Sequence, residues 1–189
     1  MHRTVVAPPA PRFGVGMASA WITRRWYYTP KSHRAYSVRQ ISPGDRRLLA
    51  EFALALSRAA PEREAAAARA MASMLFDRVI VADLHGAVGF AALESTAAGD
   101  RVIGVAAYAP VEVGAEFCIA VANSYRDEQV GRTLLLALVR HARRVGITRL
   151  TGDMFWSNRP MQMLAMSTGF VVEPLPRDRN WRRLVLSLK

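Results

Sequence analysis

The sequence contains a single cysteine, Cys118, among its 189 residues. One cysteine excludes an internal disulfide and any metal site built from several cysteines. Because Cys118 falls inside a short apolar run, we interpret it as a small buried hydrophobic residue rather than as a nucleophile.

Long hydrophobic runs are also missing from the sequence. No segment approaches about 18 uninterrupted apolar residues, the length that suggests a membrane-spanning helix. Hydrophobic residues nevertheless make up 51% of the chain, so we expect one folded domain with a substantial core. These features predict a cytoplasmic protein without a membrane partner.

Acidic residues are absent before Asp45, although seven of the 26 lysines and arginines lie there. From Asp45 onward the sequence has 19 lysines and arginines and 15 acidic residues, a net charge of +4. Much of the formal charge of +11 therefore belongs to the N-terminal segment. The remainder is only mildly basic, which argues against nucleic acid as a partner.

Residues 1–34 combine prolines, glycines and arginines without a hydrophobic period. We predict a disordered basic extension over 1–34, followed by one folded domain over 35–189. A targeting segment, a start of translation at Met17, or an arm that contacts an anionic surface or a partner subunit remain alternatives.

Strand and helix patterns follow one another from residue 35 onward. Strands are expected at 35–41, 87–93, 101–108, 115–122, 149–155, 170–173 and 184–188, and helices at 46–58, 61–75, 133–146 and 161–168, with 178–183 as a polar loop. Short connections indicate an antiparallel meander, and the strand–helix–strand crossover over 115–155 indicates one parallel pair. The predicted class is α/β (α+β), with a mixed, mostly antiparallel sheet and about four flanking helices.

The stretch from Glu116 to Gly146 is the most informative part of the chain. It reads as an apolar strand, a polar turn and a helix whose apolar side carries Leu134, Leu138, Ala142 and Val145. The first amides of a helix have no partners within it and carry partial positive charge. A strand, a turn and a helix start in this order therefore favour an anion-binding site.

Two segments of the sequence resemble signatures of the GNAT superfamily of acyl-CoA-dependent N-acyltransferases. Arg126-Asp127-Glu128-Gln129-Val130-Gly131 is similar to the family's pattern of Gln or Arg, two residues, Gly, one residue, then Gly or Ala. Gln129 stands where the family usually has the first glycine. The later segment, Asn158 through Leu164 to Gly169-Phe170, is similar to the family's Asn…Leu…Gly-Phe pattern. The resemblance implies a sheet that splays open to admit acetyl-CoA.

The same resemblance implies which residues hold acetyl-CoA, the co-substrate, and implies no metal. The backbone amides of Glu128, Gln129, Val130, Gly131 and Arg132 would bind the pyrophosphate. Backbone groups of Ile119 and Val121 would bind the pantetheine arm, and the amide side chain of Asn158 would bind CoA. Arg126 and Arg132 would add positive charge. The alternatives are solvated arginines on a helix face and an Asn158 that only caps its helix.

Acyl transfer to an amine requires a base, a group that stabilises the oxyanion, and an acid for the leaving thiolate. Glu116 is the candidate catalytic base, the alternative being a solvated carboxylate at a strand end. The amide of Val121 is the candidate oxyanion donor. Many family members have a tyrosine as the acid where this chain has Ala165. Asp153 and Trp156 are candidates for the acceptor site or for ordinary strand-end roles.

The resemblance predicts an N-acetyltransferase that moves an acetyl group from acetyl-CoA to a primary amine of a small molecule or a protein lysine. Ala115-Glu116-Phe117 and Ala165 are similar to the lysine acetyltransferase domains often fused to acyl-CoA synthetases. The alternative is a GNAT-fold module that binds acyl-CoA with weak or no turnover, which Gln129 and Ala165 favour. A nucleic-acid binder would depend on the N-terminal extension alone, and a homodimer is left open.

Overall fold

The computed structural model describes residues 25–28, 34–59, 87–126, 129–176 and 178–188. These residues form one eight-stranded sheet in the order β1-β2-β3-β4-β5-β6-β8-β7. The strands are β1 Arg25–Tyr28, β2 Ala35–Gln40, β3 Val88–Thr96, β4 Gly99–Pro110, β5 Ala115–Val121, β6 Arg149–Phe155, β7 Val171–Leu175 and β8 Asp178–Ser187. The described α-helices are α1 Arg46–Ala59, α3 Val130–Arg144 and α4 Arg159–Ser167.

The sheet is antiparallel except at one place. Strands β3 to β5 form the predicted meander, and β2 also runs antiparallel to β3. Only β5 and β6 run parallel, because α3 carries the chain from one to the other. The mixed, mostly antiparallel sheet is therefore confirmed.

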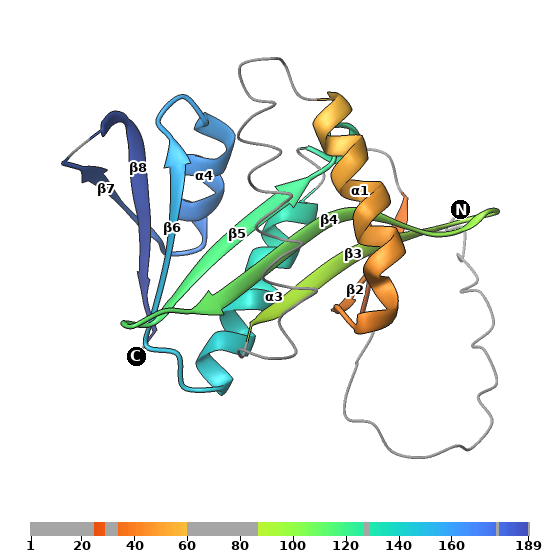
Figure 1. The fold of residues 1–189 in the computed structure, drawn as a ribbon, viewed down its shortest axis with the longest axis horizontal. Coiled ribbons are helices and arrows are strands. Elements are labelled where there is room, and N and C mark those ends of the chain that lie inside the picture. The colour runs from red at the N-terminus through yellow and green to blue at the C-terminus, as the bar shows by residue number, and fades with distance from the viewer. Residues whose placement is uncertain (1–24, 29–33, 60–86, 127–128, 177, 189) are drawn as a thin grey trace, which may run out of the picture.

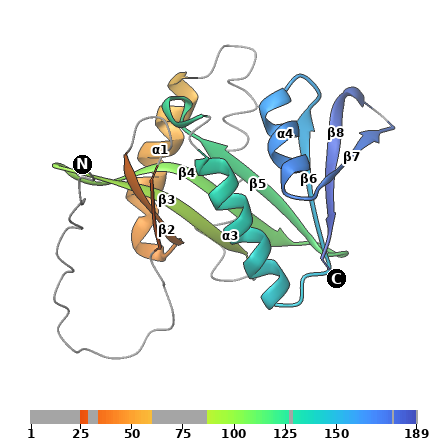
Figure 2. The same ribbon diagram turned by 180° about the vertical axis from the view of Figure 1, so that it is seen from behind.

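The helices cover the sheet from both sides. Figure 1 shows α1 in front of the central strands, and the reverse view in Figure 2 shows α3 and α4 on the opposite face. Each face has its own apolar core. Leu49 and Phe52 of α1 pack with alternate residues of β3 and β4 on one side, while α3 packs with the other residues of the sheet and with α4.

The periodic apolar side of α3 makes it the central helix of the larger core. Leu134, Leu138 and Ala142 are fully buried, as their spacing predicts. Val145 differs from the prediction because the helix ends at Arg144, and its side chain is 53% exposed beyond the last turn.

The connection before α1 is held by a buried carboxylate. Asp45 accepts paired hydrogen bonds of 2.6 Å from Arg39, and its Oδ2 also accepts from the backbone nitrogen and hydroxyl of Ser42. Burial raises the pKa of Asp45, but the bonds from Arg39 and Ser42 outweigh it and leave the pKa below its ordinary value. These bonds hold the turn at 42–45 that leads into α1.

The C-terminal part shows one correction. The predicted polar loop over 178–183 is wrong, because β8 begins at Asp178, which pairs with β7, and 181–183 pair with β6. Arg183 donates to Asp153 of β6, and the Trp181 ring lies 4.0 Å from that of Phe155. Gly169 follows α4 with φ +93°, a left-handed conformation that glycine adopts at helix ends without strain.

The N-terminal boundary also differs from the prediction. Arg25–Tyr28 forms the edge strand β1, paired antiparallel with β2, so the folded part includes residues before 34. Tyr27 stacks on Tyr36 at 5.5 Å between ring centroids, which gives the added strand an apolar contact. The helix predicted at 61–75 lies outside the described residues.

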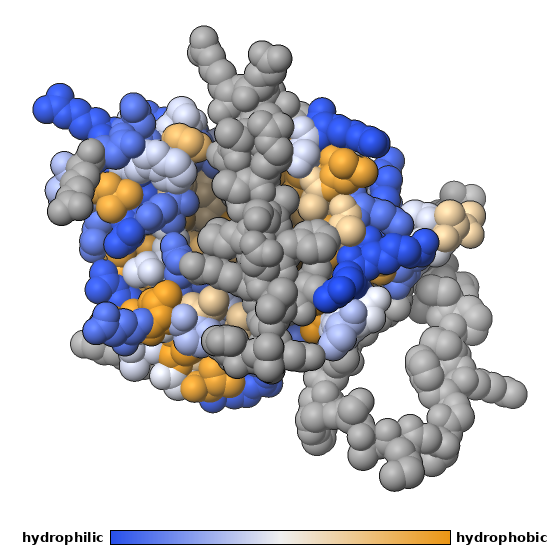
Figure 3. Space-filling model, in the orientation of Figure 1, coloured by the Kyte–Doolittle hydropathy of each residue, from blue (hydrophilic) through white to orange (hydrophobic). Residues whose placement is uncertain are grey.

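The described surface is mixed in polarity. Figure 3 shows hydrophobic patches near α1 and at the lower end of the sheet, separated by hydrophilic side chains. The exposed large apolar residues include Leu54 of α1 and Val111 and Val113 of the β4–β5 connection. Within the described residues, no helix is both long and apolar enough to cross a bilayer.

Candidate functional site

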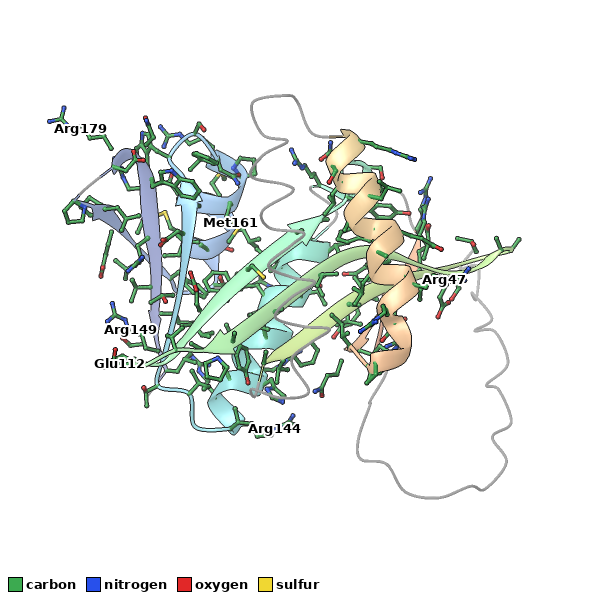
Figure 4. All side chains as sticks on the ribbon, in the orientation of Figure 1. Arg47, Glu112, Arg144, Arg149, Met161 and Arg179 are labelled. Atoms are coloured by element: carbon green, nitrogen blue, oxygen red, sulfur yellow. The ribbon has the colours of Figure 1, made fainter. Side chains whose placement is uncertain are left out.

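Strands β5 and β6 diverge soon after they begin. They pair at only two positions, Ala115 with Leu150 and Glu116 with Thr151, although both strands continue for several residues. We call the unpaired stretch, between 117–121 of β5 and 152–155 of β6, the β5–β6 gap. In Figure 4, Glu112 and Arg149 lie at its narrow end, and Met161 of α4 lies toward its wide end.

The backbone of β5 offers hydrogen-bonding groups to this gap. Ala122 donates its N–H to the carbonyl of Ile103 in β4, at 2.9 Å. Because successive backbone groups along a strand point to opposite neighbours, the N–H groups of Ile119 and Val121 point toward β6. With no strand paired to them there, these two predicted residues can bind an extended ligand.

The helix α3 begins beside the wide end of the gap. Gln129 precedes its first residue and has φ +60°, the only positive φ of a non-glycine residue in the described chain. A residue with a side chain in this left-handed conformation costs roughly 1–2 kcal/mol. The backbone therefore has the shape that the family's usual glycine would adopt without strain.

The first turn of α3 leaves backbone amides unpaired within the helix. Thr133 donates its N–H to the carbonyl of Gln129 at 2.9 Å, which is the first helical bond. The amides of Val130, Gly131 and Arg132 precede it and have no helical acceptor. They carry the partial positive charge of the helix start, as an anion site requires.

Gly131 brings the predicted residues together. A Cβ at this position would lie 3.1 Å from Leu164 Cδ2, 3.6 Å from Val121 Cγ2 and 3.9 Å from Ile119 Cδ1. The absent side chain thus lets α3 approach both β5 and α4. Ile119, Val121 and Leu164 therefore pack around the start of α3, which places the unpaired amides of the helix next to the strand edge of β5.

The other predicted cofactor residues are placed as follows. Arg126 and Arg132 are exposed, Val130 is fully buried, and Glu128 lies outside the described residues. The side-chain oxygen of Asn158 accepts the N–H of Met161 at 3.2 Å and caps α4. The capping role of Asn158 is therefore present, and its second role toward CoA stays a prediction. Ala165 is fully buried.

Glu116 lies near the narrow end of the gap, on the face of α1. Its neighbours Ala115 and Phe117 point into the core under α3, so the side chain of Glu116 points the other way. Asp153 of β6 and Arg183 of β8 share that face and form a paired contact of 2.8 and 2.9 Å. Hydrogen bonding and the charge of Asp153, then the charges of Glu116 and Glu173, raise the pKa of Arg183.

Trp156 follows the last residue of β6 and lies between two guanidinium groups. Arg159 lies 4.8 Å and Arg182 lies 4.4 Å from its ring centroid. Its backbone nitrogen donates to the carbonyl of Asn180 at 2.7 Å. The contacts hold this residue at the end of the sheet, which agrees with the strand-end interpretation.

The sequence analysis missed one polar cluster next to the site. Tyr125, in the single-turn helix Asn123–Tyr125 that follows β5, donates to Glu94 of β3, and Arg101 of β4 donates to the same carboxylate. The only sequence signals were a tyrosine directly before the Arg126 motif and an acid at the end of an apolar strand. Neither indicates a partner 31 residues away.

A model of the acetyltransferase (GNAT) family matches residues 50–170, which is more than half of the chain. The chain belongs to the GNAT family. This confirms the resemblance drawn from the Arg126 and Asn158 motifs. No curated protein matches the sequence at a significant level.

Solved structures of other family members share the fold. The GNAT domain of S. lividans PAT has a TM-score of 0.66 and 19% identity, over 87% of this chain and 97% of that one. Salmonella typhimurium yncA, a putative acetyltransferase solved with its cofactor acetyl-CoA, has a TM-score of 0.58 and 18% identity. The match covers 82% of this chain and 94% of that one. The ribosomal-protein-S18-alanine N-acetyltransferase of Escherichia coli gives the same four values. At these identities, the likeness shows the fold alone.

Proposed function

We propose that this GNAT protein transfers an acetyl group from acetyl-CoA to a primary amine of a small molecule or a protein lysine. The observation that carries the proposal is the β5–β6 gap with the start of α3 beside it. A thioester with a long polar arm and a pyrophosphate needs both a strand edge and an anion site. The described residues supply the two within contact distance of each other.

In this proposal the amides of Val130, Gly131 and Arg132 hold the pyrophosphate, together with the predicted but undescribed Glu128. The N–H groups of Ile119 and Val121 bind the pantetheine arm as a neighbouring strand would. The side-chain amide nitrogen of Asn158 is left for CoA, because its oxygen already caps α4. The Salmonella neighbour that contains acetyl-CoA supports this choice of co-substrate.

The acceptor approaches from the face of α1, where Glu116 lies. Its amine nitrogen attacks the thioester carbonyl carbon, the C–S bond breaks, and the thiolate of CoA leaves and takes up a proton. Glu116 takes the proton that the ammonium must lose. The strand rises by roughly 16 Å over the five steps from Glu116 to Val121, which is more than one water can bridge, so in this proposal a chain of several waters carries the proton.

The chain has no acidic side chain to protonate the thiolate at position 165, where many family members have a tyrosine. Ala165 has no proton to give, and it is buried in the core. Tyr125 is engaged with Glu94 and cannot replace the missing tyrosine. Water is therefore the proton donor in this proposal.

An acceptor on a protein agrees with the name of one structural neighbour. The Escherichia coli enzyme is named for an alanine of a ribosomal protein, which is an amine on a protein. The carboxylates of Glu116, Asp153 and Glu173 near Arg183 make the α1 face of the sheet suited to a cationic amine.

The second candidate is an acyl-CoA-binding module with little or no turnover. Two observations favour it, the strained Gln129 at the anion site and the buried Ala165. The module would bind acetyl-CoA through the same amides. It would release no CoA when amines are added.

The deciding experiment measures acetyl-CoA binding by calorimetry and then CoA release with a panel of amines. The panel should include polyamines, amino acids and lysine-containing peptides. Binding together with amine-dependent release supports the transferase. Binding without release on any amine supports the module, and no binding at millimolar acetyl-CoA excludes both.

A further inference from the structure

A buried carboxylate holds the chain where β5 ends and the Arg126 motif begins. Glu94 is only 9% exposed, and each of its oxygens accepts one hydrogen bond. The hydroxyl of Tyr125 donates to Oε1 at 2.5 Å, and Arg101 donates to Oε2 at 2.6 Å. Charge-assisted hydrogen bonds of this length are among the stronger ones in proteins.

The hydroxyl of Tyr125 is fully used in this cluster. Besides donating to Glu94, it accepts one hydrogen bond from Arg34 and one from Arg101, each 3.0 Å long. The two guanidinium groups also lie 5.7 and 5.9 Å from its ring centroid. The phenol is thus held by residues of β3, β4 and the segment before β2.

Charge reinforces the arrangement at neutral pH. Burial raises the pKa of Glu94, but the hydrogen bonds from Tyr125 and Arg101 and the charges of Arg101 and Arg34 outweigh it and lower the pKa. Glu94 is therefore ionised and accepts from Tyr125 and Arg101 at the same time.

The position of Tyr125 along the chain gives the cluster its significance. It is the last residue before Arg126, and its ring is buried in the same core as Val130, the first residue of α3. Tyr125, directly before the motif, and Val130, near its end, are thus both anchored in the core. Val130 is anchored by apolar packing, while Tyr125 also needs its polar partners.

We propose that Glu94 and Tyr125 are positioning residues for acyl-CoA, which hold the start of the motif so that Arg126 and the free amides of α3 face the β5–β6 gap. The inference rests on the proposed binding of acetyl-CoA. Neither side chain needs to touch the ligand. A helix start that is held in place before binding loses less conformational entropy when the pyrophosphate arrives.

The main test replaces Tyr125 with Phe, which removes the hydroxyl and keeps the ring and the charge. We expect the Kd of acetyl-CoA, measured by calorimetry, to rise about fivefold to tenfold, the effect of losing part of one charge-assisted bond. Amide hydrogen exchange at 130–132 should become faster. The matched control is Tyr108→Phe, since Tyr108 is also buried and bonds through its hydroxyl to His141 Nδ1 at 2.9 Å, away from the motif.

Glu94→Gln is the second variant, and the proposal can be tested with it alone if Tyr125→Phe does not fold. This change removes a negative charge beside an anion site, so charge alone would tighten acetyl-CoA binding. We expect weaker binding, which only loss of positioning explains. Asp45→Asn is its control, because Asp45 is also a buried carboxylate that accepts from an arginine, Arg39, but it lies next to α1.

The outcomes separate this inference from the proposed function. If the unaltered protein does not bind acetyl-CoA, the proposed function fails and the inference with it. If that protein binds and Tyr125→Phe and Glu94→Gln lower the melting temperature only, with Kd and exchange unchanged as in the controls, the inference alone is overturned.

Discussion

Gly152 of β6 lies directly against Phe117 of β5. A Cβ at Gly152 would come within 2.7 Å of Phe117 Cε1 and 2.9 Å of its carbonyl oxygen. The Phe117 ring in turn lies 5.0 Å from that of Phe170, at the end of α4. These contacts occur just beyond the last paired residues of β5 and β6, so they define the narrow end of the gap.

Replacing Gly152 with Ala should therefore destabilise the protein. The added methyl group meets backbone as well as ring atoms, so β6 must move, at a cost of about 1–3 kcal/mol. Chemical denaturation measures the loss. Gly44→Ala is the control, because a Cβ there would meet only Ser42 Oγ at 3.8 Å. Equal stability of the two variants would show that the structure accommodates a methyl group at 152, and that the close approach of Gly152 to Phe117 is not required.

Replacing Gln129 with Gly should stabilise the protein. Relief of the left-handed strain is worth roughly 1–2 kcal/mol, and the greater freedom of glycine in the unfolded chain offsets about half of it. We expect a net gain of up to about 1 kcal/mol and tighter acetyl-CoA binding. Gln129→Ala keeps a Cβ and should gain nothing. If the glycine variant were less stable than the alanine variant, the claim that the positive φ of Gln129 costs stability would be wrong.

Replacing Glu116 with Gln should slow CoA release in the presence of an amine by about tenfold to a hundredfold, because general-base catalysis typically contributes that much or more. The Kd of acetyl-CoA should not change, since Glu116 lies at the narrow end of the gap. Glu112→Gln is the matched control, an exposed glutamate in the β4–β5 connection nearby. Equal rates of CoA release in the two variants would show that Glu116 is not the catalytic base.

Acid should destabilise the protein through Asp45. Its pKa is lower in the folded state than in the unfolded chain, so the stabilisation is present above the unfolded value of about 4 and is lost as the pH falls through the folded value. The melting temperature measured between pH 7 and pH 3 should show this fall. Asp45→Asn should lower stability at pH 7 and flatten the slope below pH 4. An unchanged slope would show that Asp45 does not contribute.

Local patterns were sufficient for most elements of the sheet and the helices. The apolar spacing of α3 and the hairpin connections are each decided by neighbouring residues, so they were predicted. The start of β8 was not, because polar residues become strand only when β6 and β7 supply partners. The exposure of Val145 was not predicted either, because the apolar spacing does not show that α3 ends one residue earlier, at Arg144.

The candidate site divides in the same way. The order of residues from Glu116 to Phe170 by itself indicated the family, which the family model confirms, and predicted a binding site at the start of α3, because the motifs are short and local. The tertiary structure alone decided that β5 and β6 pair at two positions and then separate, and that Gln129 has a positive φ. It also decided that Glu94, Arg101 and Tyr125 meet, since that contact joins residues far apart in the chain and depends on the burial that only the folded sheet provides.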